Sequence, residues 1–193
     1  LANETEAALA LRMASAVRQM LHAGMTTVRI PGDSRHADLA LARSIDRGES
    51  VGPRIYSSGE PLIITGGHGS KPGVLYADGP YELIKQAREQ ISLGAEWIKI
   101  RISGGLATQG GSVAEALMTP EEIGAVIDAS HRFGAKVAAH SGSPQATAVA
   151  VAAGIDSIEH GYALDRDTLR LMRDAGTWFV PTIVVSQPAT AAF

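Results

Sequence analysis

The chain has 193 residues, of which 45% are hydrophobic and 19% are charged, an ordinary globular composition. Its net charge is −3 and it contains no basic run, so we expect no nucleic-acid partner. No apolar stretch of about 18 residues is present, so we expect no membrane span. Cysteine is absent, which excludes disulfides, thiolate metal sites and cysteine nucleophiles and is compatible with a cytoplasmic protein.

Helices and strands alternate along the first half of the chain. Apolar spacing predicts helices, and short runs rich in β-branched residues that follow a glycine predict buried strands. A loop over 59–79, rich in glycine and proline, is longer than a simple connection needs. The predicted order is helix 4–23, strand 26–30, helix 36–47, strand 54–58, helix 80–93 and strand 96–102.

The second half repeats this alternation. Thr119, Pro120 and Glu122 have the spacing of a capping box with proline in the first helical turn, which predicts a helix start. Glycine residues follow the helices and mark their ends. The predicted order is helix 119–133, strand 136–140, helix 144–153, strand 157–159, helix 165–175 and strand 178–183.

Strands that alternate with helices imply right-handed crossovers and a parallel sheet, so the fold class is α/β. Six such strands favour a (β/α)8 TIM barrel over an open doubly wound sheet, because no G-x-G-x-x-G follows an early strand. A complete barrel takes about 250 residues. The chain also begins at Leu1 rather than Met, so we expect a partial barrel cut from a longer product.

Polar residues fall at the ends of the predicted strands, where parallel barrels collect their chemistry. His140 and His160 each close an apolar strand, and His68 lies in the long loop after the second strand. A single histidine at such a place is most often a core residue. Two on consecutive strands can reach one ion, because neighbouring strands lie about 5 Å apart. The pattern, taken with Lys99, therefore predicts a metal site.

Lys99 lies inside a buried strand, where a charged amine is costly. Burial lowers the pKa of a lysine, and Arg101 on the same strand face would lower it further. A neutral amine can add carbon dioxide to form a carbamate, which is a metal-binding carboxylate on a long stem. The alternative is an ordinary ion pair with Glu96 or Glu159, and both interpretations stay open.

Two glycine-rich segments have two interpretations each. Gly104 and Gly105, like Gly110 and Gly111, either make a sharp turn that needs positive φ or cradle a phosphate, and the turn is favoured. The segment 66–69 is either a mobile loop or a loop that presents His68 to a substrate.

Several motifs, in the same order along nearly the whole chain, resemble the imidazolonepropionase-like branch of the amidohydrolase superfamily. The resemblance is greatest to zinc-dependent Xaa-Pro or Xaa-Arg dipeptidases and N-acyl amino acid hydrolases. The matching segments are Gly24-Met25-Thr26-Thr27-Val28-Arg29, Gly52-Pro53-Arg54-Ile55, Thr65-Gly66-Gly67-His68-Gly69, Ile98-Lys99-Ile100, Ser103-Gly104-Gly105, Ala138-Ala139-His140 and Ile158-Glu159-His160-Gly161.

The resemblance implies a metal-dependent hydrolase of amide bonds with two zinc ions. Lys99, carboxylated, would bridge them, and His140 and His160 would be further ligands. His68, Tyr162 and Arg101 would hold the substrate, a dipeptide or N-acyl amino acid. The family's H-x-H pair and its strand 8 Asp have no counterpart, so residues 1–193 would be the central part of the barrel, strands 2–7. We expect this piece alone to be inactive and the intact protein to be a homo-oligomer.

Two other functions are consistent with parts of the pattern. A lysine at a barrel strand followed by a Ser-Gly turn also resembles the Schiff-base lysine of class I aldolases, which needs a depressed pKa as well. That interpretation leaves His140 and His160 without a role. A non-catalytic barrel module is the other alternative.

Overall fold

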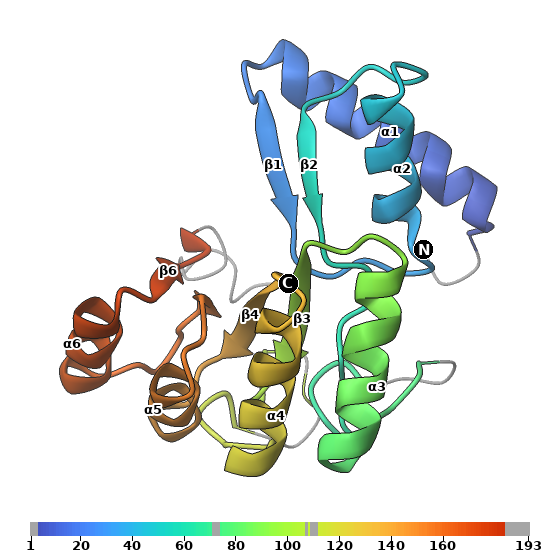
Figure 1. Cartoon of the computed structure of the whole chain (residues 1–193). Coiled ribbons are helices and arrows are strands. Elements are labelled where there is room, and N and C mark those ends of the chain that lie inside the picture. Colours follow the sequence, from blue (N-terminus) through green and yellow to red (C-terminus); the bar gives the residue numbers. More distant parts are fainter. Residues whose placement is uncertain (1–3, 71–73, 107, 109–111, 184–193) are drawn as a thin grey trace.

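The computed structural model describes residues 4–70, 74–106, 108 and 112–183. Helices and strands alternate along this part of the chain, in the order expected from the sequence (Figure 1). The elements are α1 (Glu6–His22), β1 (Thr27–Ile30), α2 (Ala37–Asp46), β2 (Arg54–Ser57), α3 (Gly79–Ser92), β3 (Trp97–Arg101), α4 (Pro120–His131), β4 (Lys136–Ser141), α5 (Pro144–Ala152), β5 (Ser157–His160), α6 (Arg166–Ala175) and β6 (Trp178–Val180).

The largest difference from the predicted bounds is at the last strand. The sequence predicts a strand that continues to residue 183, but β6 ends at Val180. Pro181 follows directly and has no backbone N–H to donate to a neighbouring strand, which explains the early end. The capping box of α4 is present as predicted, with Thr119 and Glu122 each accepting from the other's backbone N–H.

Every pairing between named strands in the described ranges is parallel, so the fold is α/β with parallel strands. One sheet has the order β1-β2 and the other β3-β4-β5-β6. Backbone hydrogen bonds connect the sheets at the β2–β3 boundary: Glu96 N donates to Ser57 O at 3.1 Å, and Leu62 N donates to Lys99 O at 2.8 Å. The two sheets therefore lie next to each other, with β2 of one sheet beside β3 of the other.

A second connection joins the sheets through side chains. Arg29 on β1 donates through Nη2 to Glu159 Oε1 on β5 at 2.8 Å, and through Nη1 to Ser157 Oγ at 3.2 Å. The Arg29 guanidinium also lies 4.5 Å from the ring centroid of Trp97 on β3. The two hydrogen bonds to β5 span 128 and 130 residues of sequence, and with the Trp97 contact they fix β1 relative to β3 and β5.

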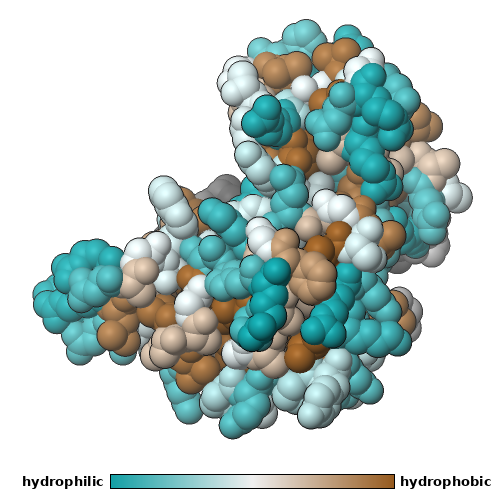
Figure 2. Space-filling model, viewed as in Figure 1, coloured by the Kyte–Doolittle hydropathy of each residue, from teal (hydrophilic) through white to brown (hydrophobic). Residues whose placement is uncertain are grey.

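Two hydrophobic clusters stabilise this arrangement. The larger one packs the strands β3, β4 and β5 against their helices, and the smaller one joins α1, α2 and β2 through Val17, Leu41 and Ile55. Helices cover the strands on one side, and Figure 2 shows hydrophilic side chains over the outer surface of α6 with hydrophobic ones toward the sheet. No helix in the described ranges is both long enough and apolar enough to cross a membrane.

Candidate functional site

Lys99, His140 and His160 come from three neighbouring strands, β3, β4 and β5. In the strand register Arg101 pairs with His140, and Ser141 pairs with His160, so the three side chains lie at one end of the sheet. The imidazole centroids of His140 and His160 are 4.8 Å apart. Lys99 and His140 are only 5% and 4% exposed, which places both within the protein.

The two nitrogens of His140 have different surroundings. Nε2 lies 3.0 Å from the carbonyl oxygen of Gly104. A carbonyl oxygen can only accept a hydrogen bond, so Nε2 carries the proton and the lone pair is on Nδ1. Burial lowers the pKa of His140 to about 3, so the ring is neutral at neutral pH. His140 therefore has the protonation state that a metal ligand needs.

His160 ends β5 with a backbone φ of 72°, a left-handed conformation that is uncommon outside glycine. Its Nδ1 lies 2.9 Å from Thr182 Oγ1. The Thr182 hydroxyl in turn is 3.4 Å from the carbonyl oxygen of Val180. Burial, assisted by the charge of Lys99, lowers the pKa of His160 to about 4. Like His140, this ring is neutral and has one nitrogen held by a neighbouring group.

Lys99 is the third member of the cluster. Its pKa is lowered to about 7, mainly by burial and also by the charges of Arg101 and Arg29, which outweigh the opposing effect of Glu159. Its stem packs beside Gly32, where a Cβ would lie 3.5 Å from Lys99 Cγ. Glu159 is paired with Arg29 at 2.8 Å, and Lys99 has no ion pair within 4.0 Å among the described residues. The geometry thus favours a partly neutral amine over an ordinary ion pair.

His68 lies against the same cluster. Its ring is stacked on that of His140, with centroids 4.3 Å apart and planes inclined by 16°. Arg101 Nη1 donates to the carbonyl oxygen of His68 at 2.9 Å. A Cβ on Gly69 would lie 1.6 Å from Arg101 Nη1, so a side chain there would displace the guanidinium, and the φ of 82° at Gly69 also favours glycine. These contacts place the segment 66–69 against the ring of His140, and the substrate role of His68 stays a prediction.

The expectation that Gly104 and Gly105 need positive φ was wrong, because neither residue has it. Their role is close approach. A Cβ on Gly105 would lie 2.4 Å from His68 Cε1 and 2.7 Å from His140 Nε2. A Cβ on Gly104 would lie 2.2 Å from the carbonyl oxygen of Ser112. The turn after β3 thus packs its bare backbone against both imidazoles. Gly110 and Gly111 lie outside the described residues.

Tyr162 and Arg101 complete the set of residues expected at the site. The Tyr162 ring is stacked on His160, with centroids 5.2 Å apart and planes inclined by 3°. Burial raises the pKa of its hydroxyl, so Tyr162 is a neutral hydrogen-bond donor. All six residues expected from the sequence therefore lie in one region: Lys99, His140, His160, His68, Tyr162 and Arg101.

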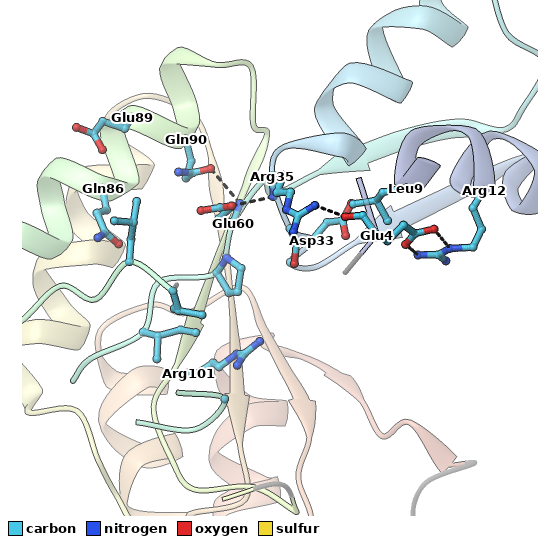
Figure 3. Close-up of a pocket in the computed structure, with 17 residues that line it drawn as sticks. Glu4, Leu9, Arg12, Asp33, Arg35, Glu60, Gln86, Glu89, Gln90 and Arg101 are labelled. Carbon is cyan, nitrogen blue, oxygen red and sulfur yellow. Dashed lines mark hydrogen bonds and ion pairs between the residues drawn. The ribbon is translucent and has the colours of Figure 1, made fainter. Parts of the chain in front are cut away.

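A cavity of about 710 Å³ adjoins this region, with Arg101 and Gly69 in its wall (Figure 3). Figure 3 shows Arg35 between Glu60 and Glu4: its backbone N–H donates to Glu60 Oε1 at 2.8 Å, and its Nη1 to Glu4 O at 2.6 Å. The cavity does not include the three histidines in its wall. We regard the histidine cluster as the chemical site because its groups converge, and the cavity as neighbouring space.

The donor atoms of the cluster match what a metal ion needs only in part. No group of three or more His, Asp or Glu among residues 4–70, 74–106, 108 and 112–183 is arranged to hold a metal by itself. His140 Nδ1 and His160 Nε2 nevertheless have no hydrogen-bond partner in the part of the chain that the structure describes, while the other nitrogen of each ring is held by Gly104 or Thr182. Metal-binding histidines are held in this way. The residues fit a metal site that draws a further ligand from Lys99.

Comparison with known proteins gives the family. The family model described as "Amidohydrolase family" matches residues 2–191. The chain belongs to the amidohydrolase family. It is 30% identical to ochratoxinase of Aspergillus niger over 195 aligned positions, covering 89% of this chain and 40% of the relative. It is also 35% identical to an uncharacterised protein of Mycobacterium bovis over 129 positions, covering 64% of this chain and 34% of that protein.

Solved structures of amidohydrolases have the same fold. A Xaa-Pro dipeptidase with methionine in its active site superposes with a TM-score of 0.80 at 34% identity, covering 90% of this chain and 46% of that one. The ochratoxinase of A. niger superposes with a TM-score of 0.88 at 29% identity, covering 97% of this chain and 48% of that one. The chain thus spans less than half the length of these amidohydrolases.

Three residues near the site were not found from the sequence. Thr108 Oγ1 lies 2.8 Å from His68 Nδ1, and Thr182 Oγ1 lies 2.9 Å from His160 Nδ1. Arg29 on β1 holds Glu159, the residue before His160. The two threonines lie after strands without any periodic signal. Only Arg29 carries a sequence signal that could have drawn attention to it, because it is a charged residue inside an apolar strand.

Proposed function

We propose that this chain forms strands 2–7 of a (β/α)8 barrel and that the intact protein is a metal-dependent hydrolase of amide bonds. The substrate class we propose is a dipeptide or an N-acyl amino acid. The observation that carries the proposal is the neutral pair His140 and His160 beside Lys99, whose pKa is lowered to about 7. The prolidase and ochratoxinase relatives support the hydrolase class.

The metal ligands we propose are Lys99, His140 through Nδ1 and His160 through Nε2, with zinc as the metal and two ions in the intact protein. The neutral amine of Lys99 would attack the carbon of carbon dioxide and lose a proton, which leaves a carbamate. When bound, the metal supplies Lewis acidity, which lowers the pKa of a water and polarises a carbonyl. The family's strand 8 Asp, which would accept the proton of that water, is not in this sequence.

The remaining residues would hold the substrate. His68 and Tyr162 flank the pair His140 and His160, each stacked on one of these rings. Both carry polar hydrogens suited to a carbonyl or carboxylate oxygen. Arg101 adds a positive charge beside His68 and supports the binding of a carboxylate, although its first contact is with the loop backbone. This arrangement would orient an amide substrate before its bond breaks.

The class I aldolase alternative shares one feature with the hydrolase, a buried lysine with a lowered pKa. It gives no role to the two histidines that face Lys99. Membership of the amidohydrolase family also speaks against it. The non-catalytic alternative gives no reason for two neutral histidines, each with one ring nitrogen that has no partner among the described residues. We therefore propose only the hydrolase.

The experiment is replacement of Lys99 by Ala in the full-length protein, with Lys136→Ala as the matched control. Lys136 lies on the neighbouring strand β4 beside Trp97 but is exposed. We expect Lys99→Ala to lower bound zinc and the hydrolysis of Xaa-Pro dipeptides and N-acyl amino acids, and Lys136→Ala to retain both. Unchanged zinc content and turnover in Lys99→Ala would rule out the bridging role. We expect the 193-residue chain alone to be inactive.

A further inference from the structure

Each histidine of the cluster has one ring nitrogen against a defined partner, and these partners decide where the ring proton lies. For His140 the partner is the carbonyl of Gly104, so its Nε2 is the donor. For His68 and His160 the partner is a threonine hydroxyl, which can either donate or accept. The direction of these two bonds follows from the other contacts of each hydroxyl.

The hydroxyl of Thr108 has two hydrogen-bond neighbours among the described residues. The backbone N–H of Gly105 donates to Thr108 Oγ1 at 2.9 Å. His68 Nδ1 lies 2.8 Å from the same oxygen and is the only acceptor for the hydroxyl proton among the described residues. The chain of bonds therefore runs from Gly105 N–H to Thr108 O–H to His68 Nδ1. In that direction the His68 lone pair is on Nδ1 and its proton is on Nε2.

Thr182 gives the opposite result. Its hydroxyl has the carbonyl oxygen of Val180 as an acceptor at 3.4 Å. The hydroxyl oxygen can then accept from His160 Nδ1, which leaves the His160 lone pair on Nε2. Each of the two threonine hydroxyls thus contacts the Nδ1 of a histidine, but His68 has its proton on Nε2 and His160 has its proton on Nδ1. His160 has the form of a metal ligand, and His68 has the form of a hydrogen-bond donor.

We propose that Thr108 is a positioning residue that holds His68 in its Nε2–H tautomer, so that His68 donates a hydrogen bond to a substrate oxygen instead of binding a metal. The inference rests on the proposed hydrolase function for the identity of that oxygen, the carbonyl or carboxylate of an amide substrate. The tautomer is inferred from the contacts of Thr108 with Gly105 and His68 among the described residues, and it does not depend on that function. It excludes His68 as a third histidine ligand, although its ring is stacked on His140.

The surroundings of His68 also keep the ring from turning over. One face is stacked on His140, and the edge that bears Nδ1 and Cε1 lies against Gly105. Arg101 holds the backbone of the same residue through its carbonyl oxygen. Rotation of the ring by half a turn would replace Nδ1 by a carbon atom and break the bond to Thr108. The orientation and the tautomer are therefore set together.

The first test is nuclear magnetic resonance of the chain labelled with ¹⁵N-histidine, at about pH 8, above the ordinary histidine pKa. Long-range correlations distinguish a protonated ring nitrogen from an unprotonated one, and His68→Asn assigns the signals. We expect Nε2 of His68 to be protonated in the wild type and in Thr108→Ser. We expect a mixture of tautomers in Thr108→Val, which has the same shape without the hydroxyl. A protonated Nδ1 in the wild type, or no change in Thr108→Val, would overturn the proposal.

The second test measures the kinetics of the same variants in the full-length protein. We expect Thr108→Val to lower kcat about tenfold with its zinc content unchanged, and Thr108→Ser to restore kcat. Loss of zinc in Thr108→Val would overturn the proposal, because it would make His68 a ligand. If the tautomer is as expected but no amide substrate is hydrolysed, the proposed function fails while the assignment of the His68 proton stands.

Discussion

Arg29 on β1 and Glu159 on β5 form an ion pair between the two sheets, with Nη2 and Oε1 separated by 2.8 Å. The Glu159 side chain is 4% exposed and that of Arg29 is 20% exposed. Glu159 directly precedes His160 and also raises the pKa of Lys99. The pair therefore holds β1 in place and sets the charge beneath the candidate metal site.

Arg29→Met is expected to destabilise the protein, because it leaves the Glu159 carboxylate buried without its partner. Breaking such a pair from one side costs about 3–5 kcal/mol. The measurement is the free energy of unfolding in urea. The control is Arg132→Ala, which removes an exposed ion pair with Asp128 and should leave stability unchanged. A double variant, Arg29→Met with Glu159→Gln, should recover part of the loss. Equal effects of Arg29→Met and Arg132→Ala would contradict the role of burial.

Lys99→Met is expected to stabilise the protein in a pH-dependent way. The pKa of Lys99 is about 7 in the folded chain, against an ordinary value of 10.5. Between these values the unfolded chain binds a proton that the folded chain does not, so lowering the pH favours unfolding by up to about 1.4 kcal/mol per unit. Below the folded pKa both states are protonated and the penalty stays constant.

The stability advantage of Lys99→Met over the wild type should therefore grow as the pH falls from about 10 to about 7 and then level off. Urea unfolding of both proteins in buffers free of metal and carbon dioxide measures this difference. An advantage that does not depend on pH would show that Lys99 keeps its ordinary pKa in the folded protein.

Gly105→Ala should disturb the histidine cluster without a large effect on the fold. The added Cβ would meet the rings of both His68 and His140, so at least one of them has to move. We expect zinc affinity in the full-length protein to fall about 10–100-fold, as happens when the groups that orient metal ligands are changed. Gly124→Ala in α4 is the control, because its Cβ meets nothing within 4 Å. Equal zinc affinity in the two variants would argue against close packing at Gly105.

Thr182→Val should weaken metal binding, because the Nδ1–H of His160 loses its acceptor and the ring is free to turn. The expected loss of zinc affinity is about 10–100-fold. Thr182→Ser retains the hydroxyl and should bind zinc like the wild type. Valine keeps the branched shape at this residue, whose φ is 49°, so backbone strain is the same in both proteins. Competition with a chromophoric chelator provides the affinity, and no loss in Thr182→Val would remove Thr182 from the site.

The element order could be predicted because its signals are local. The capping residues of α4 lie within four positions of one another, and the hydrophobic runs of β3 and β4 are continuous. The placement of His140 and His160 follows from the same reasoning, since His160 ends β5, His140 lies one residue before the end of β4, and the ends of parallel strands lie together. The low pKa of Lys99 was expected on another local ground, because the sequence places this charged residue inside an apolar strand.

Contacts between loops could not be predicted, because they depend on how distant segments meet. Thr108 and His68 are 40 residues apart, and Arg29 and Glu159 are 130 apart. The two glycines after β3 show this limit most clearly. Their sequence favoured a sharp turn with positive φ, which neither glycine has. The structure shows instead that a side chain would meet a pair of imidazoles at Gly105 and a backbone carbonyl at Gly104.

The contact between Gly69 and Arg101 has a consequence for how these two positions can vary among related proteins. The guanidinium occupies the space that any side chain at 69 would need, and the φ of 82° at Gly69 adds a second restriction. A side chain at 69 would push the guanidinium away from the carbonyl oxygen of His68, so a relative that keeps this contact should keep glycine at 69. Where 101 is a shorter residue, asparagine or aspartate becomes tolerable at 69, since these residues adopt left-handed backbone most readily. Variation at the two positions should be coupled.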